Sequence, residues 1–377
     1  MKILIITMTC GEGHNKIAEA IKNEIDSRGN ANECKVCQLY GFSQKEVVKQ
    51  NKTFLRVCKT IPHLYEAVWK HNCRKPFKPY IKSTVKQCRK YVLGIIREYN
   101  PDVIICTHVN AGAVISALKS EGELAGIKTY SVVFDYCLCP YWEYNAGVDY
   151  AVIPHEDMTD EMIAKGYAPE QLLPFGLPVA ERFTKSVDKR SAREELGLKQ
   201  DVFTVALYSG GNCVSSAYKL IRQLQKCSTP MQIIAICGHN KKEFDKIAKY
   251  VSKRGKTNIL NLGFCNKLDV VYSASDVVFT RGGGMGLTEQ INKCVPFVLR
   301  EKLIINERVN KRLFAQKGMA VAMDRLSDAP SIVDKLANDR AALQKMSDNA
   351  RAYRKTTSTS DFVDHILNLT VDCNKYA

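Results

Sequence analysis

The chain has 377 residues, of which 45% are hydrophobic, and its formal net charge is +16. This length and composition predict a soluble protein of two globular domains with substantial cores. No apolar run reaches the roughly 20 residues that a membrane-spanning helix needs, and the N-terminus predicts a buried strand instead of a signal peptide. The fifteen cysteines are odd in number and scattered, which indicates a reducing cytoplasm.

The first thirty residues predict a strand, a turn and a helix. Residues 3–7 are the expected strand and residues 10–14 the turn, after which isoleucines recur every fourth residue from Ile17 to Ile25. The turn places His14 at the N-terminus of the helix, where the helix dipole lowers the pKa of the imidazole and favours a neutral base. A solvated histidine with no chemical role is the alternative at this position.

A cationic segment follows between Gly41 and Asn100, where fourteen Lys and Arg residues accompany three acidic ones. Aromatic and aliphatic side chains are interleaved with these cations, which suits a surface that attracts anions and inserts apolar groups. A nucleic-acid target and a merely solvated helical face are the alternatives. We favour an anionic membrane surface and expect no nucleic acid; the residues expected to contact membrane or acceptor here are Trp69, Lys75, Lys78, Lys82 and Lys86.

Strands and helices then alternate, which predicts a parallel sheet covered by helices. The expected strands are 103–107, 129–134 and 150–154, and the expected helices are 112–118 and 158–165. His108, Asp135 and His155 each fall at the carboxyl end of an expected strand, where open α/β sheets bind their ligands. Residues 176–201 are charged and poor in apolar side chains, which predicts a linker.

A second alternating set follows the linker, with expected strands at 203–208, 232–236, 258–262 and 277–280. Each ends in a loop that contains glycine, so four backbone-rich turns should meet along one edge of a sheet. Two domains of this kind would face each other across a cleft. Cys34–Cys37 and Cys137–Cys139 lack a matching second pair for zinc, so we expect no metal site.

The glycine-rich stretch 279–290 is the most informative motif in the chain. Four glycines between Gly282 and Gly286 leave a bend without side chains, where backbone N–H groups at the start of a helix over 287–293 can approach an anion. Arg281 adds a positive charge, and Glu289 can accept hydrogen bonds from the hydroxyls of a sugar. Phosphate and sugar together indicate a nucleotide. The stretch lacks the P-loop lysine and the dinucleotide-binding spacing, which argues against ATP hydrolysis and NAD.

The order and spacing of the motifs over nearly the whole chain resemble the monogalactosyldiacylglycerol synthase and processive diacylglycerol glucosyltransferase group of glycosyltransferase family 28. The residues that carry the resemblance are Gly11-x-Gly13-His14 with Ala18, Thr107-His108, Phe134-Asp135 with Trp142, Gly176-Leu177-Pro178, Cys237-Gly238, Leu262-Gly263-Phe264, Gly283-Gly284 with Glu289, and Asn306-Glu307 with Asn310.

This resemblance implies a GT-B fold with two Rossmann-like domains whose parallel sheets face across a cleft. We expect an N-terminal acceptor domain at 1–178, a UDP-sugar domain at 179–355, and a C-terminal helix at 356–377 that crosses back. The implied reaction is an inverting transfer of a hexose from a UDP-sugar to a lipid such as diacylglycerol. It needs no cofactor or catalytic metal and takes place at the cytoplasmic face of the membrane.

The resemblance also implies a role for each matching residue. His14 would be the general base, and Asp135 would orient it or the acceptor; His108 and Trp142 would face the acceptor. Glu289 would bind the ribose. The remaining donor-binding residues are Gly13, Ser209, Gly210, Gly238, Phe264, Arg281, Gly283, Gly284, Asn306 and Glu307.

Departures from the family pattern leave the donor sugar open among galactose, glucose and N-acetylglucosamine. Ile304-Ile305-Asn306-Glu307 replaces a Pro-Gly-Gln-Glu loop, and Cys139 stands where relatives often carry His. Three alternatives also remain: a UDP-sugar 2-epimerase of the same fold, a transferase for another lipid-linked or polyprenyl acceptor, and a basic binding protein without turnover.

Overall fold

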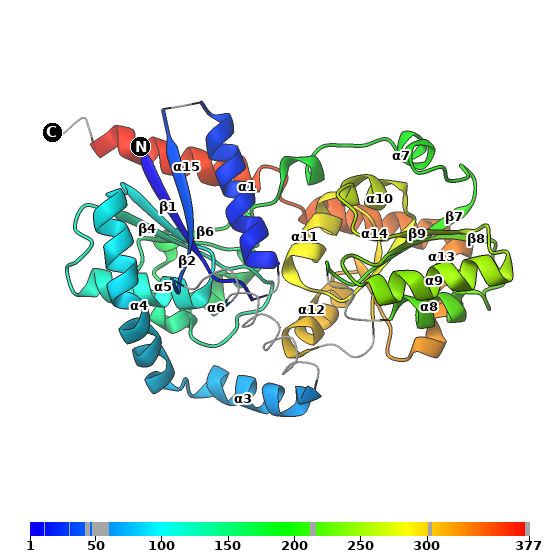
Figure 1. Ribbon diagram of the computed structural model, residues 1–377, viewed down its shortest axis with the longest axis horizontal. Helices are drawn as coiled ribbons and strands as arrows, with labels where there is room; N and C mark the ends of the chain where they lie inside the picture. The colour runs from blue at the N-terminus through cyan, green and yellow to red at the C-terminus, as the bar shows by residue number, and fades with distance from the viewer. Residues whose placement is uncertain are drawn as a thin grey trace. The chain divides into compact units, whose positions relative to one another are not determined.

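The computed structural model describes residues 1–10, 12–29, 31–41, 46, 60–211, 216–300 and 304–373 (Figure 1). For residues 62, 63, 65 and 369–373 it describes the backbone alone. Gly11, most of the cationic segment before residue 60, and the loop 212–215 therefore lie outside the described residues. The chain forms two compact units: unit 1 contains Met1–Glu181 and Lys355–Ala377, and unit 2 contains Arg182–Arg354.

Unit 1 is built on a parallel sheet of order β2-β1-β3-β4-β5-β6. Its strands are Lys2–Thr7 (β1), Glu33–Gln38 (β2), Val103–Cys106 (β3), Lys128–Val132 (β4), Tyr150–Val152 (β5) and Leu172–Leu173 (β6). Its α-helices are Gly13–Ser27 (α1), Pro62–Arg74 (α3), Lys78–Tyr99 (α4), Val109–Ser120 (α5), Thr159–Ile163 (α6) and Ser358–Cys373 (α15). Short 3-10 helices are Trp142–Tyr144, Glu156–Met158, Pro169–Gln171 and, where the chain passes into unit 2, Glu181–Phe183.

The C-terminal helix α15 lies beside α1 within unit 1 (Figure 1). Arg28 and Asp364 form an ion pair of 3.2 Å between the two helices, but both side chains are exposed, so the pair contributes little. The larger contribution comes from Phe362, Val363 and Ile366, which are almost fully buried. This packing fixes the last helix of the chain on the first.

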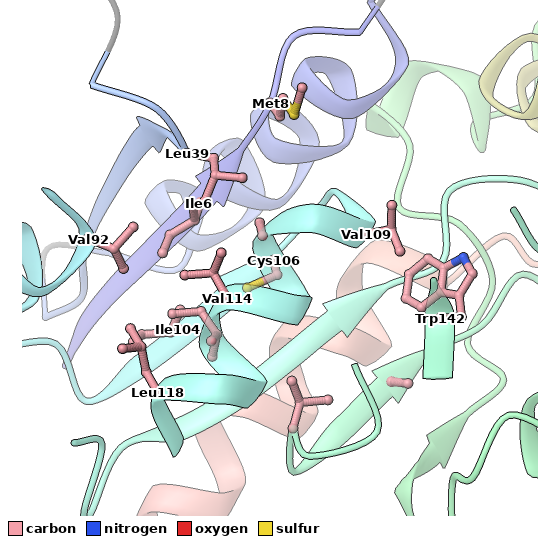
Figure 2. Packing of buried hydrophobic residues seen from close by; sticks show 14 of the residues in the cluster. Ile6, Met8, Leu39, Val92, Ile104, Cys106, Val109, Val114, Leu118 and Trp142 are labelled. Carbon is pink, nitrogen blue, oxygen red and sulfur yellow. The ribbon is translucent and has the colours of Figure 1, made fainter. Parts of the chain in front are cut away.

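The core of unit 1 explains why the strands are so apolar. A sheet covered by helices on both faces buries every side chain of its central strands, and all four side chains of β3 are buried. Figure 2 shows Ile6 and Ile104 of the sheet packed with Val114 and Leu118 of α5 and Val92 of α4. No helix in the described part of the chain is long and apolar enough to cross a membrane.

Unit 2 repeats this architecture with a parallel sheet of order β12-β11-β10-β7-β8-β9. Its strands are Phe203–Tyr208 (β7), Met231–Ile236 (β8), Ile259–Leu262 (β9), Val277–Thr280 (β10), Phe297–Leu299 (β11) and Ala320–Ala322 (β12). Its helices are Lys189–Glu195 (α7), Ala217–Leu224 (α8), Lys241–Arg254 (α9), Leu268–Ala274 (α10), Gly284–Asn292 (α11), Ile305–Gln316 (α12), Ala329–Asn338 (α13) and Arg340–Tyr353 (α14), with a 3-10 turn at Leu326–Asp328.

The expected linker 176–201 is not without structure, because it contains α7. Asp188 caps this helix by accepting a hydrogen bond of 2.9 Å from the N–H of Ser191. Ala192 and Arg193 are buried, and Arg193 donates to a carboxylate oxygen of Asp276 at 2.8 Å. The charged residues that suggested a linker therefore include one that anchors α7 to unit 2.

Candidate functional site

His14 lies at the carboxyl edge of the unit 1 sheet, as the second residue of α1, and is 2% exposed. Its Nδ1 is 2.5 Å from the carbonyl oxygen of Thr107, which follows β3. Because a carbonyl oxygen can only accept, Nδ1 must carry the proton, and in the neutral ring Nε2 keeps its lone pair. Burial lowers the pKa of His14 to about 4, against a smaller raising effect of this hydrogen bond. Burial is thus the largest cause of the neutral imidazole.

His108 lies against His14, with 4.5 Å between the ring centroids. It is the N-cap of α5, and its Nδ1 accepts a hydrogen bond of 3.0 Å from the N–H of Asn110. A neutral ring that accepts at Nδ1 carries its proton at Nε2. Burial, and then the charge of His14, hold the pKa of His108 well below its usual value. The two neutral imidazoles therefore have opposite tautomers: His14 can take a proton at Nε2, and His108 can donate one.

Asp135 lies on the next loop of the same edge, after β4, and is 2% exposed. One of its carboxylate oxygens accepts from the N–H of Tyr136 at 2.9 Å. The preceding Phe134 packs on His14, with 4.0 Å between ring centroids. The carbonyl of Thr107 and the ring of Phe134 hold His14 in place. The expected role of Asp135 in orienting His14 stays a prediction. A role of Asp135 toward an acceptor stays a prediction.

Trp142 corrects the sequence analysis. It was expected to face an acceptor, but it is 1% exposed and belongs to the hydrophobic core of unit 1, where Figure 2 shows it near Val109. Its ring packs inside this core, so it does not face an acceptor. The neighbouring Tyr141 has a φ of +83°, a conformation that is costly outside glycine and that directs the chain into the 3-10 turn of Trp142.

In unit 2, the four strands expected to end in glycine loops are adjacent in the sheet, in the order β10-β7-β8-β9. The loops pack through their backbones: Gly238 donates to the carbonyl of Gly263 at 3.0 Å, and His239 donates to that of Gly211 at 2.8 Å. Gly238 has a φ of +54°, and a Cβ there would collide with the Gly211 carbonyl, so no other residue fits. Ser209 and Gly210 precede this contact at the end of β7.

The glycine-rich bend after β10 has the form of an anion site. Gly282 has a φ of +93°, and the Asn310 side chain donates to its carbonyl at 2.8 Å. Gly283 is the N-cap of α11, and no atom lies within 4 Å of the place where its Cβ would be. The space beside Gly283 is thus open at the N-terminus of α11, and a helix N-terminus is the end that binds phosphate.

Two expectations about this bend need correction. The helix begins at Gly284 and not at residue 287, so Glu289 lies inside α11, where it is 1% exposed. Arg281 is paired with Glu307 at 2.9 Å, and both side chains are largely buried. The positive charge of Arg281 is therefore already balanced, and Glu307 is also held by the N–H of Ile304 at 3.3 Å. Asn306 lies beside Glu307 in the first turn of α12 and is partly exposed.

Phe264 is 59% exposed, although it is a large aromatic residue. Its ring stacks on that of His239 from the neighbouring loop, with 4.5 Å between centroids and 19° between planes. An exposed aromatic ring at the carboxyl edge of a nucleotide-binding type of sheet suits the stacking of a base.

The sequence analysis missed one cation at this edge. Arg300 directly follows β11 and is 3% exposed, and its guanidinium donates to the Ser209 hydroxyl and to the Ser216 carbonyl, both at 3.4 Å. A charged residue at the end of the apolar run Val295–Leu299 was the signal that could have revealed it. Among the described residues, no group of three or more His, Cys, Asp or Glu is placed to hold a metal ion.

The cationic helices of unit 1 carry an exposed apolar stripe. Ile61, Leu64 and Val68 follow helical spacing and are 45%, 58% and 51% exposed, and Phe77, which caps α4, is 59% exposed. Trp69 is partly buried. Four lysines are exposed and have no ion pair with a carboxylate in the described parts of the chain; they are Lys75, Lys78, Lys82 and Lys86.

Comparisons with known proteins decide the family. Residues 14–179 match the family model of monogalactosyldiacylglycerol (MGDG) synthase, and residues 212–366 match that of the glycosyltransferase family 28 C-terminal domain. The chain belongs to glycosyltransferase family 28, in the monogalactosyldiacylglycerol synthase group. It is 24% identical to a processive diacylglycerol beta-glucosyltransferase of Bacillus pumilus, over 97% of this chain and 94% of that protein. It is also 24% identical to a protein of the same name from Staphylococcus epidermidis, over 98% and 93%.

Solved structures confirm the GT-B fold class of this family 28 protein. MurG of Acinetobacter baumannii aligns with a TM-score of 0.62 at 14% identity, over 97% of this chain and 99% of that one. HepE of Anabaena in complex with UDP aligns with a TM-score of 0.58 at 14% identity, over 98% and 100%. The UDP-GlcNAc 2-epimerase of Neisseria meningitidis, bound to UDP-GlcNAc, aligns with a TM-score of 0.60 at 13% identity, over 98% of this chain and 100% of that one. At such low identity these likenesses establish the fold alone.

Proposed function

We propose that this family 28 protein transfers a hexose from a UDP-sugar to the hydroxyl of a diacylglycerol-type lipid, with inversion at the anomeric carbon. The observation that carries the proposal is the tautomer of His14. The proton of its ring is held on Nδ1 by the Thr107 carbonyl, so Nε2 is unprotonated at neutral pH. An unprotonated imidazole nitrogen at the carboxyl edge of the sheet can accept the proton of an alcohol.

In the proposed step, Nε2 of His14 takes the hydroxyl proton while the hydroxyl oxygen forms a bond to the anomeric carbon. The bond between that carbon and the UDP oxygen breaks, and its electron pair leaves with UDP. A single displacement of this kind inverts the anomeric centre. The N–H of His108 would donate to the acceptor oxygen and favour its correct orientation, because the tautomer of His108 presents a donor beside His14.

UDP gains negative charge as it leaves, and fixed N–H groups would stabilise it. The open space at Gly283, in front of the first turn of α11, supports placing the diphosphate there. Arg281 is paired with Glu307, and Arg300 beside Ser209 is a second cation at this edge. Uracil would stack on Phe264, and Glu289 would accept hydrogen bonds from the ribose.

The choice of substrates follows from the relatives. The proteins named processive diacylglycerol beta-glucosyltransferase match nearly the whole chain, which supports diacylglycerol as acceptor and UDP-glucose as the first donor to test. The N-terminal match to MGDG synthase makes UDP-galactose the second donor. We infer that the exposed apolar stripe of Ile61, Leu64 and Val68, with its unpaired lysines, holds the protein on the anionic inner face of the cell membrane.

The test incubates the protein with UDP-glucose, UDP-galactose or UDP-N-acetylglucosamine, with and without diacylglycerol in mixed micelles. We expect UDP release only when the lipid is present, and a product whose anomeric configuration is opposite to that of the donor. Epimerised donor without acceptor would establish the 2-epimerase instead. Transfer to a polyprenyl phosphate but not to diacylglycerol would correct the acceptor, and no turnover with any pair would leave a binding protein.

His14→Ala tests the mechanism. Loss of a general base slows transfer by roughly 10²–10⁴-fold, and UDP affinity should stay unchanged because the donor loops belong to unit 2. His365→Ala is the matched control, since His365 is a partly buried histidine of α15 in the same unit. It packs against aromatic rings, and its Nδ1 lies 3.3 Å from the Tyr130 hydroxyl. Transfer by His14→Ala within a few-fold of the control would remove His14 from the mechanism.

A further inference from the structure

Unit 2 contains a cavity of about 540 Å³ that none of the preceding roles uses. Asp276, which precedes β10, and Pro296, which precedes β11, both line it. The cavity therefore opens at the amino edge of the parallel sheet, whereas the glycine loops lie at the carboxyl edge. Its volume falls in the range of roughly 300–1,000 Å³ that is typical of pockets for small molecules.

The charge of this cavity is strongly positive. Its one acidic lining residue among the described parts of the chain is Asp276. This carboxylate is already shared, because Lys189 lies 2.6 Å from it, Arg193 2.8 Å and Arg340 3.7 Å. The cationic lining residues are Lys185, Lys189, Lys293, Arg340, Arg351 and Arg354. Asp276 therefore neutralises part of the positive charge at one end of the cavity, and cationic side chains predominate in the rest of its lining.

Two of these cations form no ion pair in the described part of unit 2. Lys293 donates to the carbonyl of Lys185 at 2.6 Å, and Arg354 lies 3.4 Å from both the Asn292 carbonyl and the Cys294 sulfur. The Asp269 carboxylate acts on Lys293 without pairing with it, and its effect on the pKa is smaller than that of burial. Burial lowers the pKa of Lys293, so its charged form is held there at a cost that a bound anion would offset.

A buried amide adds to this end of the cavity. Asn292 lines it and is 3% exposed, and its carboxamide oxygen has no hydrogen-bond partner. The oxygen and nitrogen of such an amide can exchange places by rotation, so Asn292 can turn its N–H groups toward an acceptor. An ammonium, a guanidinium and an amide thus line the same cavity, and phosphate is a group that such donors bind well.

We propose that Lys293, Arg354 and Asn292 form a binding site for a phosphate ester at the amino edge of unit 2. The ligand is a free phosphomonoester or the phosphate of a lipid headgroup, since both present the same dianionic group. The site is separate from the donor loops, and the inference does not rest on the transferase activity proposed above.

The location gives the site a regulatory use. Thr184 and Lys185 follow the point where the chain enters unit 2, Arg354 is the last residue before it returns, and all three line the cavity. A bound phosphate would tie the first and last segments of unit 2 to Asn292 and Lys293, at the C-terminal end of α11. The other end of α11 is the glycine bend. Ligand bound here therefore fixes the helix that the donor loops depend on.

The test is calorimetric titration of the full chain at low ionic strength with inorganic phosphate, glycerol 3-phosphate and, as an ionic-strength control, sodium chloride. We expect one phosphate site. The double variant Lys293→Gln/Arg354→Gln should lose affinity by about tenfold or more, because two charge-assisted hydrogen bonds are removed. Lys253→Gln/Arg254→Gln is the matched control: it removes the same two residue types at the exposed C-terminal end of α9.

Vesicles that contain phosphatidic acid separate the two sources of the ligand. If the protein binds soluble phosphates, the ligand is a free phosphate ester. If it binds only the vesicles, and the Lys293→Gln/Arg354→Gln variant loses this binding while the control variant keeps it, the ligand is a lipid headgroup. Equal phosphate affinity in all three proteins, or no binding to either ligand, would overturn the proposal. Hydrogen exchange of the wild type avoids any folding defect of the variants. Phosphate should slow exchange at residues 184–189 and 292–296 and leave α9 unchanged, and uniform or absent protection would also overturn the site.

Discussion

His14 should make unit 1 sensitive to acid. Its pKa is about 4 in the folded protein, against 6.5 for an ordinary histidine. Between these two values the unfolded chain binds a proton that the folded chain does not, so the free energy of unfolding must fall as the pH falls from about 6.5 to 4. At about 1.4 kcal/mol per pH unit, the lowering is worth about 3 kcal/mol of stability, fully present above pH 6.5. His108, whose pKa is also lowered, acts in the same direction.

Urea unfolding followed by tryptophan fluorescence measures this loss for unit 1 alone, because Trp69 and Trp142 are the only tryptophans in the sequence. The stability of the wild type and of His14→Gln is compared from pH 7.5 to pH 4. We expect the wild type to lose about 3 kcal/mol more than the variant, since carboxylate effects are common to both. His71→Gln, at an exposed position of α3, is the control and should follow the wild type. Parallel curves for His14→Gln and the wild type would refute the account of a buried, neutral imidazole.

Three further predictions concern the donor loops and the cationic helices. Glu289→Ala should weaken UDP binding by about 1.5–3 kcal/mol through loss of hydrogen bonds to the ribose, and unchanged calorimetric affinity would remove Glu289 from the site. Glu307→Gln should tighten UDP binding several-fold, because it frees the charge of Arg281 for the diphosphate; weaker binding would show that the ion pair itself shapes the site. Reversal of four lysines to Glu should abolish co-sedimentation with anionic vesicles and leave UDP affinity unchanged; the four are Lys75, Lys78, Lys82 and Lys86. If the wild type does not bind such vesicles at low salt but binds DNA or RNA, the proposed membrane contact is wrong.

Much of the fold could be predicted because buried parallel strands are apolar runs. The strands at 203–208 and 277–280 were predicted with the bounds that the structure has. The missed β2 is an edge strand of sequence ECKVCQ with no fully buried side chain, so its pattern gave no signal. Beginning α11 at residue 287 was wrong because glycine is a poor helix former in the interior but costs little at the N-terminus.

The site was predictable where it depends on sheet position and unpredictable where it depends on the backbone. His14 was predicted at the start of a helix and His108 at the carboxyl end of a strand, and the structure places the two rings together at this edge. The carbonyl of Thr107, which sets the tautomer of His14, has no signature in the sequence, since every residue carries such a group. Trp142 was assigned to the acceptor by the resemblance to the family, but only the packing of unit 1 shows that it is buried.

A chain of hydrogen bonds connects the cationic helices of unit 1 with the imidazole pair. The N–H of Asn110 donates to Nδ1 of His108 and fixes its tautomer, and the side chain of Asn110 donates to the Tyr80 hydroxyl at 2.8 Å. Tyr80 lies in the first turn of α4, beside the exposed Phe77 and Lys78. Asn110, which fixes the proton of His108 on Nε2, is thus hydrogen-bonded to a residue of the surface proposed to contact the membrane.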